Sequence, residues 1–320
     1  MSEDELLSFA GLHTYSLFSR PSKVGVEQFA KPFVTGGSLK EFLAGLPRQL
    51  LGLDFPELVE RVVRARQGGR PVIVGLGAHV IKVGLNPVLI DLMERSIVTA
   101  LAVNGACAVH DTEIALAGKT SEDVDAVLGD GAFGAVRETA EIVNEAAITG
   151  AGNGKGFGRA LGERLLQGDS RYPELSLFAS AARLDMPLSV HVALGTDIVH
   201  IHPSADGAAI GRASYLDFQR FCRQVADLDG GVYLNLGSAV LMPEVFLKAL
   251  TVVRNLGHPV TRLTTANFDF LRQYRSMTNV VNRPTAGEGG RGFHFTGHHE
   301  LMVPLLAAAI KERLAEAAAA

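Results

Sequence analysis

The stretch that most constrains the fold of this chain is 97–118, IVTALAVNGACAVHDTEIALAG. A β-rich apolar segment runs into Asn104-Gly105, and the helix that follows carries His110, Asp111 and Glu113 in its first turns. A strand that ends at a glycine and continues into such a helix is how an α/β sheet builds a ligand crevice. The first N–H groups of the helix lack partners and carry partial positive charge, so they attract a phosphate or a carboxylate. The stretch therefore predicts a nucleotide-type site.

Strand-like and helix-like segments alternate along most of the chain. Apolar runs indicate strands at 71–76, 97–103, 188–193, 198–201, 231–236 and 260–265. Amphipathic segments indicate helices at 55–66, from Asn86-Pro87 onward, and at 107–117, 133–147, 157–166, 174–183, 215–226, 243–255 and 299–317. This alternation predicts an α/β fold with a mostly parallel sheet covered on both faces. We expect an arm and a helix in 1–70 that pack on one α/β domain over 71–320, so that the chain is a single domain overall.

Composition narrows the functional classes. Hydrophobic residues make up 47% of the 320 residues and aromatic residues only 7%, with no Trp, so the core is expected to be mostly aliphatic. The net charge of −4 argues against nucleic acid as a partner. Two cysteines, Cys107 and Cys222, are too few for a disulfide framework and fit a reducing cytoplasm. The chain shows no signal peptide and no run of 18 apolar residues, so we expect a cytoplasmic protein with no membrane partner.

Two glycine-rich motifs resemble phosphate-binding loops without matching them. Gly75 and Gly77 follow an expected strand, but the third glycine of the dinucleotide fingerprint is replaced by Val80. The segment 150–158, GAGNGKGFG, departs from the P-loop because its spacing is one residue short and Gly156 stands where Ser or Thr is needed. We interpret it as a loop between two helices, with a mobile lid as its functional alternative.

Histidines suggest two kinds of chemistry. His200 and His202 alternate on an expected strand, and with His298 and a carboxylate they would suit a metal-dependent hydrolase. No HExxH or CxxC spacing supports a metal, so we predict none. His110 lies beside Asp111 and Glu113, an arrangement that suits proton transfer near neutral pH.

Several segments together resemble a known enzyme family. The run 103–113, VNGACAVHDTE, with the preceding GLGAHVIKVGLNPVLIDLMERSIVTAL, resembles the NAD-binding part of deoxyhypusine synthases. It is even more similar to the cyclodeaminase portion of bacterial and archaeal ornithine-to-proline enzymes, in which an Asn, small residues and His-Asp-x-Glu recur. The likeness extends to 193–197 (ALGTD), 236–240 (LGSAV) and 264–269 (TTANFD), and covers about 70–310 in the same order.

The resemblance implies a deoxyhypusine synthase-like, Rossmann-like three-layer fold that binds NAD at the strand ends. It also implies a homotetramer with sites at subunit interfaces. Carried over position by position, the expected cofactor contacts are Gly77, Asn104, Gly105, His110, Asp111, Asp197, Gly237, Thr265 and Asp269.

Two departures from the family speak against deoxyhypusine synthesis. The family's imine-forming lysine has no counterpart, because no lysine occurs between Lys248 and Lys311. Arg283 and Arg291 lie in that region, and a guanidinium stays protonated and cannot form a Schiff base. The family's histidine after its GGGV-type turn is also missing, since Met-Pro-Glu stands at 242–244.

The sequence therefore predicts an NAD-dependent enzyme that acts on a small amine or amino acid through transient oxidation and imine chemistry, as an ornithine cyclodeaminase does. His110 and Asp111 are the expected proton-transfer residues. The expected substrate-binding residues, which would hold a carboxylate or an amine, are Asn282, Arg283, Glu288 and Arg291. The alternative is a non-catalytic ligand-binding or scaffold protein that keeps the fold.

Overall fold

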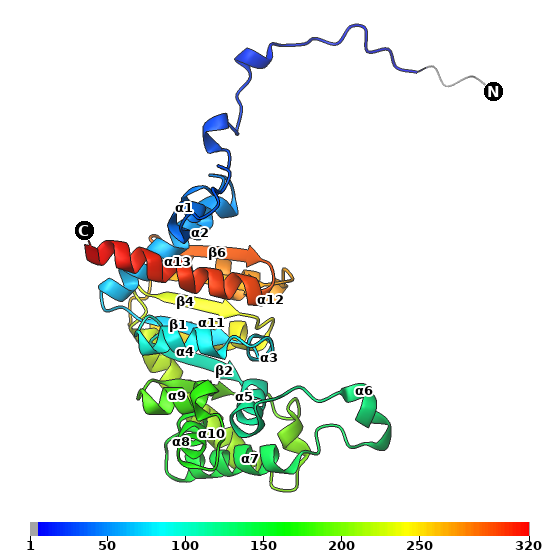
Figure 1. The fold of residues 1–320 in the computed structure, drawn as a ribbon, viewed down its shortest axis with the longest axis vertical. Coiled ribbons are helices and arrows are strands. Elements are labelled where there is room, and N and C mark those ends of the chain that lie inside the picture. Colours follow the sequence, from blue (N-terminus) through cyan, green and yellow to red (C-terminus); the bar gives the residue numbers. More distant parts are fainter. Residues whose placement is uncertain (1–5, 320) are drawn as a thin grey trace, which may run out of the picture. The chain divides into compact units, whose positions relative to one another are not determined.

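A computed structural model describes residues 6–319, and the chain divides into two compact units, Met1–Leu53 and Asp54–Ala320 (Figure 1). The first unit contains the short turns η1 (Leu17–Ser19) and η2 (Val26–Gln28) and the helix α1 (Leu39–Ala44). Ser38 caps α1, since its hydroxyl accepts a hydrogen bond from the Glu41 N–H. None of residues 6–50 is buried, so this arm has no core of its own.

The second unit is built on a six-stranded sheet in which every strand pair is parallel. The strand order is β3-β2-β1-β4-β5-β6, the order of the doubly wound Rossmann fold. The strands are β1 (Val72–Leu76), β2 (Ala100–Asn104), β3 (Leu188–His191), β4 (Val232–Leu236), β5 (Thr264–Asp269) and β6 (Arg291–Thr296). This architecture confirms the predicted α/β class with a parallel sheet.

Helices and short helical turns connect the strands. They are α2 (Leu51–Gln67), α3 (His79–Lys82), α4 (Asn86–Glu94), α5 (Gly105–Ala117), α6 (Val124–Val127), η3 (Leu128–Asp130), α7 (Arg137–Gly152), α8 (Phe157–Gln167), η4 (Pro173–Leu175), α9 (Leu177–Arg183), η5 (Ile198–Ile201), α10 (Gly207–Ala226), α11 (Leu241–Asn255), α12 (Tyr274–Ser276), the π-helix η6 (Met277–Asn282) and α13 (His299–Ala319). None of the helices in 6–319 is long and apolar enough to cross a membrane.

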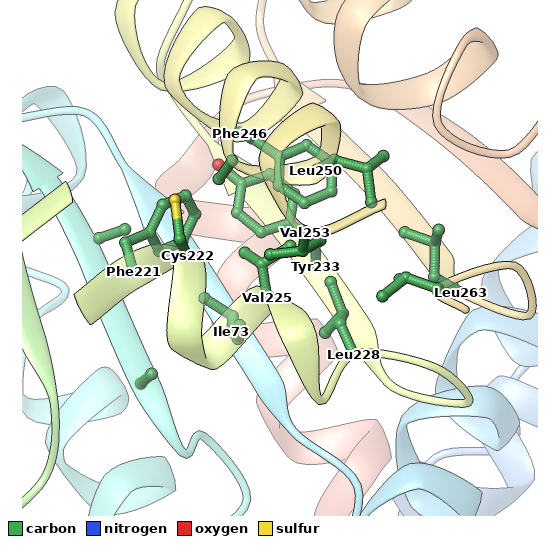
Figure 2. Close-up of a cluster of buried hydrophobic side chains, with 14 of the residues drawn as sticks. Ile73, Phe221, Cys222, Val225, Leu228, Tyr233, Phe246, Leu250, Val253 and Leu263 are labelled. Atoms are coloured by element: carbon green, nitrogen blue, oxygen red, sulfur yellow. The ribbon is translucent and has the colours of Figure 1, made fainter. Parts of the chain in front are cut away.

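Helices cover the sheet on both faces. On one face, side chains of α2, α4 and α13 surround Val74 and Leu234 in an apolar layer. On the other face, α10 and α11 pack on Ile73 and Tyr233, as Figure 2 shows. The Tyr233 ring stacks on Phe246 with a centroid distance of 3.8 Å. The predicted three-layer arrangement is thus confirmed, with an aliphatic core and a small aromatic centre.

Gly75 has a packing reason to be a glycine. A Cβ atom at position 75 would lie 2.0 Å from the Tyr233 hydroxyl oxygen, because the tyrosine fills the space beside β1. The backbone of Gly75 therefore makes room for the core. The phosphate-loop interpretation of the Gly75-Leu76-Gly77 turn depends on Gly77 alone.

Several element boundaries differ from those expected. Residues 198–201 form the 3₁₀ turn η5 and not a strand, and β5 spans Thr264–Asp269 where 260–265 was predicted. The strand β6 lies in the glycine-rich stretch where no regular element was expected. The second unit begins at Asp54, and its helix α2 buries Leu58 and Val62. The segment between α7 and α8 is the helix-to-helix loop that the sequence predicted.

Candidate functional site

The strand order places the topological switch point of the sheet between the carboxyl ends of β1 and β4. From β1 the chain proceeds to β2 and β3 on one side, and β4 to β6 lie on the other, so the two strands flank the topological switch point. Ligands of open α/β sheets bind at this point. In Figure 1 the arrowheads point toward α3, α5 and α12, which lie at this carboxyl edge of the second unit. The site is therefore built from the segments that follow the strands.

Two glycines line the switch point. The Gly77 N–H donates to the Leu236 carbonyl over 2.9 Å, and a Cβ atom on residue 77 would lie 2.1 Å from the Gly237 carbonyl oxygen. Gly237 has a φ of +67°, a conformation that favours glycine. The two turns thus meet backbone to backbone.

Aromatic rings surround this glycine contact. His299 is fully buried, with its Cε1 and Nε2 atoms 3.1 Å from the Cβ position that residue 237 would have. Its Nε2 lies 3.1 Å from the Phe268 carbonyl, and its Nδ1 has no partner among the described residues. Burial lowers the pKa of His299, which favours the neutral ring. The rings of His79 and Phe270 lie 5.5 and 6.2 Å from it. The three rings form an aromatic cluster beside the glycine contact.

The start of α5 forms the second part of the site. Asn104 caps the helix, because its Oδ1 accepts a hydrogen bond of 3.1 Å from the Cys107 N–H. The carboxylate of Asp197 lies over the next residue: a Cβ atom on Gly105 would be 1.9 Å from Asp197 Oδ2. Burial raises the pKa of Asp197, although His200 and His110 oppose this shift. The anion-attracting helix start is therefore already occupied by a carboxylate of the chain itself.

Backbone groups fix the orientation of His200 beside this carboxylate. Its Nδ1 accepts hydrogen bonds of 3.2 Å from the N–H groups of Gly195 and Asp197. A neutral His200 therefore carries its proton on Nε2, which lies 3.9 Å from Asp197 Oδ2. The result is a histidine–carboxylate pair at the N-terminus of α5.

His110 belongs to a relay of side chains on the next turn of α5. The Thr120 hydroxyl donates to Glu113, so it can only accept from His110 Nδ1, which lies 2.7 Å away. Glu113 also lies 3.7 Å from His110 Nδ1, and this proximity contributes to a lowered pKa of Glu113 that burial opposes. The relay leaves the His110 Nε2 lone pair available, as a general base requires.

The structure gives Asp111 a structural role. Its fully buried carboxylate accepts hydrogen bonds from Asn86 Nδ2, the Ser176 hydroxyl and the N–H groups of Leu177 and Phe178. The last two belong to the first turn of α9, whose N-terminus Asp111 therefore caps. Burial raises its pKa to about 6. This carboxylate is therefore not exposed to a substrate.

The expected substrate-binding residues lie at the opposite, amino edge of the sheet. Arg291 is the first residue of β6, pairs in register with Thr264 and forms ion pairs with Asp54 and Glu57. Arg283 donates to Asn279 at the end of η6. Asn282 also lies there, and Glu288 lies in the turn before β6. Because parallel strands all begin at one edge, Arg291 lies at the end of the sheet opposite the carboxyl ends of β1 and β4.

Thr265 is also misplaced as a cofactor contact. It is the second residue of β5, is fully buried, and donates its hydroxyl proton to the Val280 carbonyl over 2.7 Å. The remaining expected contacts do follow strands at the carboxyl edge; they are Gly77, Asn104, Gly105, Asp197, Gly237 and Asp269. Asp269 ends β5 and its Oδ1 accepts from the Leu271 N–H.

Two polar features at this edge escaped the sequence analysis. Arg272 follows β5 by three residues and is exposed, without an acidic partner in 6–319. Burial lowers the pKa of His294, and the charge of Arg272 lowers it further. A buried row of amides crosses the sheet, because Asn235 donates to Asn267 over 2.7 Å and Asn267 lies 3.0 Å from His294. The pairing register of β4, β5 and β6 would have predicted this row, since the three residues are cross-strand neighbours.

The histidines considered as metal ligands do not face a common point. His200 binds backbone N–H groups, His202 contacts Ser204, and His298 stacks with Phe270. Within 6–319 no three His, Cys, Asp or Glu side chains form a group that could hold a metal ion. The geometry gives the metal-dependent hydrolase no support.

Comparisons with known proteins bear on the fold. No protein-family model and no curated protein sequence matches the chain. Among solved structures it is similar to a conserved protein described as LOR/SDH from Methanococcus maripaludis S2, with 15% identity, a TM-score of 0.51, and 82% of this chain and 70% of that chain covered. AgrE in its ternary complex with ornithine and NAD⁺ gives 17% identity, a TM-score of 0.51, and coverage of 82% and 33%.

A protein described as a deoxyhypusine synthase from Entamoeba histolytica matches at 9% identity and a TM-score of 0.50, with 88% of this chain and 95% of that chain covered. At such identities the likeness establishes a shared Rossmann-like fold and nothing finer. The chain spans about a third of the length of AgrE.

Proposed function

We propose that this chain binds NAD at the switch point and is an enzyme that acts on a small amine or amino acid, with a reaction of the ornithine cyclodeaminase kind. The observation that carries the proposal is that Gly77, Gly237 and the start of α5, over which Asp197 lies, all follow strands at the carboxyl edge of a sheet with the Rossmann strand order. AgrE, whose fold is similar, forms a complex with ornithine and NAD⁺. The missing lysine argues against deoxyhypusine synthesis.

The residues present fit a dinucleotide. Gly77 and Gly237 meet backbone to backbone, so a side chain at position 77 would push the two turns apart at the switch point. Asp197 is unsuited to a phosphate because both are anions, but its carboxylate can accept a hydrogen bond from a ribose hydroxyl or from an ammonium group. His79 and Phe270 offer ring faces to a planar group.

The side chains around α5 provide the proton chemistry. When bound, NAD would accept a hydride from the carbon that bears the amine and return it. His110 would take the amine proton at Nε2, while Thr120 and Glu113 hold its Nδ1 proton and stabilise the imidazolium. Arg272, at the same edge, has the charge to bind a substrate carboxylate.

Calorimetry with purified protein tests the proposal. We expect NAD to bind, and His110→Gln to bind it within about twofold while it loses about 100-fold or more of any amine-dependent absorbance change at the NADH wavelength. His258→Gln is the matched control, because His258 is exposed and follows α11 at the amino edge. Absence of binding of both NAD and NADP at millimolar concentration would refute the proposal.

A non-catalytic scaffold is the second candidate, favoured by the missing lysine and by the structural role of Asp111. It predicts that NAD binds but that no small amine or amino acid changes the spectrum of the bound cofactor. A screen of basic, acidic and aliphatic amino acids against the NAD-loaded protein separates the two candidates.

We further propose that the protein is a homotetramer. The arm supports this proposal, because its apolar side chains have no core within the first unit; exposed examples are Phe9, Leu12, Tyr15, Phe18 and Phe29. Apolar side chains in this number are typical of an interface. Light scattering should give four chains for the full protein and fewer after removal of 1–37. A monomer in both cases would refute the proposal.

A further inference from the structure

A cavity lies beside α5, away from the contact between Gly77 and Gly237. Its volume is about 590 Å³, within the usual range for small-molecule sites. The walls come from the second half of α5, the segment after it, and the start of α7; the lining residues are Glu113, Leu116, Ala117, Lys119, Thr120, Ser121, Glu122, Val136, Glu138, Thr139 and Ile142. None of the residues that we assign to NAD belongs to this lining.

The walls of the cavity are apolar. Leu116 on α5, Ile142 on α7 and Val136 before α7 are only partly buried, although each lines the hollow. Contact between these apolar side chains and water is unfavourable. An apolar ligand in the hollow would remove this surface from water and would gain affinity as a result. The Glu122 carboxylate accepts a hydrogen bond of 3.0 Å from the Gly134 N–H, which ties the two ends of the segment 122–134 together at the rim.

The charged groups of the cavity are mostly acidic. Glu113 is largely buried, and its lowered pKa, which burial opposes, keeps it ionised at neutral pH. Glu122 adds a second carboxylate, whereas Glu138 is already paired with Arg137, which does not line the cavity. Lys119 is the one lining residue with a positive charge, and it is exposed at the rim. An apolar hollow with a fixed carboxylate is complementary to an ammonium group on an aliphatic chain.

We propose that this cavity binds a primary amine that carries an apolar tail, with the ammonium on Glu113 and the tail between Leu116 and Ile142. This site goes beyond the proposed NAD-dependent activity, and its binding requires no cofactor. Glu113 also receives the Thr120 hydroxyl that holds His110 Nδ1. An amine on Glu113 competes with Thr120 for the same carboxylate, so occupancy of the cavity is coupled to the orientation of His110.

Calorimetry with n-hexylamine, in the absence of NAD, measures the binding directly. We expect n-hexylamine to bind about tenfold more tightly than hexanoate, because the carboxylate of hexanoate meets Glu113. We also expect affinity to rise about two- to fourfold for each methylene from butylamine to hexylamine, as apolar burial requires. Equal affinities for the amine and the acid would overturn the proposal.

Variants locate the binding in the cavity. Ile142→Arg places a cation in the hollow and should weaken hexylamine binding about tenfold or more, and Glu113→Gln should do the same. Ile148→Arg is the matched control, because Ile148 lies on α7, is 46% exposed and does not line the cavity. If Ile142→Arg and Ile148→Arg, both folded by circular dichroism, bind hexylamine equally, the proposal fails.

The coupling has its own readout. In nuclear magnetic resonance spectra, hexylamine should shift the His110 imidazole signals of the parent and much less those of Thr120→Val. Failure of the NAD proposal would leave hexylamine binding intact, since the assay contains no cofactor. Conversely, a protein that binds NAD but not hexylamine refutes only the proposed amine site.

Discussion

The Asp197 carboxylate lies over Gly105, so close that a Cβ atom at position 105 would be 1.9 Å from Asp197 Oδ2. A glycine at the start of α5 is therefore required by the chain's own acid and not only by a ligand. The start of α5 attracts anions, and here the loop after β3 supplies the carboxylate that occupies it.

A double-mutant cycle tests this contact. Gly105→Ala should cost about 1–3 kcal/mol of the free energy of unfolding in the parent, because the new methyl group displaces Asp197. In an Asp197→Ala background the same substitution should be neutral or stabilising by up to about 1 kcal/mol, since alanine favours the helix. Urea denaturation of the four proteins gives the coupling. An equal cost in both backgrounds would contradict the close contact.

Asp111 should matter for stability more than for ligand binding. Asp111→Ala leaves the N–H groups of Leu177 and Phe178 and the hydroxyl of Ser176 without their acceptor in a buried place. We expect a loss of about 3 kcal/mol or more in the free energy of unfolding. Asp227→Ala is the control, because this exposed carboxylate makes only a surface ion pair with Arg223 and should cost about 0–1 kcal/mol. Similar losses for the two variants would show that the buried cap is unimportant.

Local rules predicted the fold well where buried strands and helix caps produce strong patterns. The runs that became β1 and β4 are buried at every position and mostly apolar, and Asn104 precedes its helix as a cap does. The strand expected at 198–201 was wrong because a short apolar run does not separate a strand from a 3₁₀ turn. β6 was missed because an edge strand buries only alternate residues, here Phe293 and Phe295, among glycines.

The site was predicted less well, because sequence order does not say at which edge a residue lies. Arg291 follows the 264–269 segment (TTANFD) closely in sequence. As the first residue of β6, however, it lies at the amino edge of the sheet. Recognition of β6 would have moved Arg291 away from the crevice and drawn attention to Arg272, which follows β5. His110 and its relay to Thr120 depend on a contact ten residues apart that no local pattern encodes.

Asp229 should control part of the acid stability. Burial alone would raise its pKa, but hydrogen bonds from the Arg262 guanidinium and from the N–H groups of Arg262 and Thr261 lower it to about 2. The unfolded chain, with a pKa near 4, then binds more protons between pH 2 and 4, so this carboxylate stabilises the fold above about pH 4 and loses its effect as the pH falls to about 2.

Asp229→Asn should therefore remove about 1–2 kcal/mol at pH 6 and much less near pH 2, after allowance for solvent screening of a partly exposed pair. Urea denaturation at several pH values, taken as the difference between parent and variant, isolates this contribution. A difference that does not shrink toward pH 2 would contradict the assigned ionisation.

Arg272 should bind the negatively charged part of a ligand, whereas Arg283 should not. Arg272 is exposed at the carboxyl edge without an acidic partner in the described chain, and Arg283 is tied to Asn279 toward the amino edge. Loss of a charge-assisted contact costs about 1.5–3 kcal/mol, which corresponds to about a tenfold or larger loss of affinity. Calorimetry with NAD, and with an amino acid on the NAD-loaded protein, should show this loss for Arg272→Gln in at least one titration. Arg283→Gln should stay within about twofold of the parent in both. The reverse ranking would return substrate binding to the segment around Arg283, and with parallel strands that requires a site completed by a second chain.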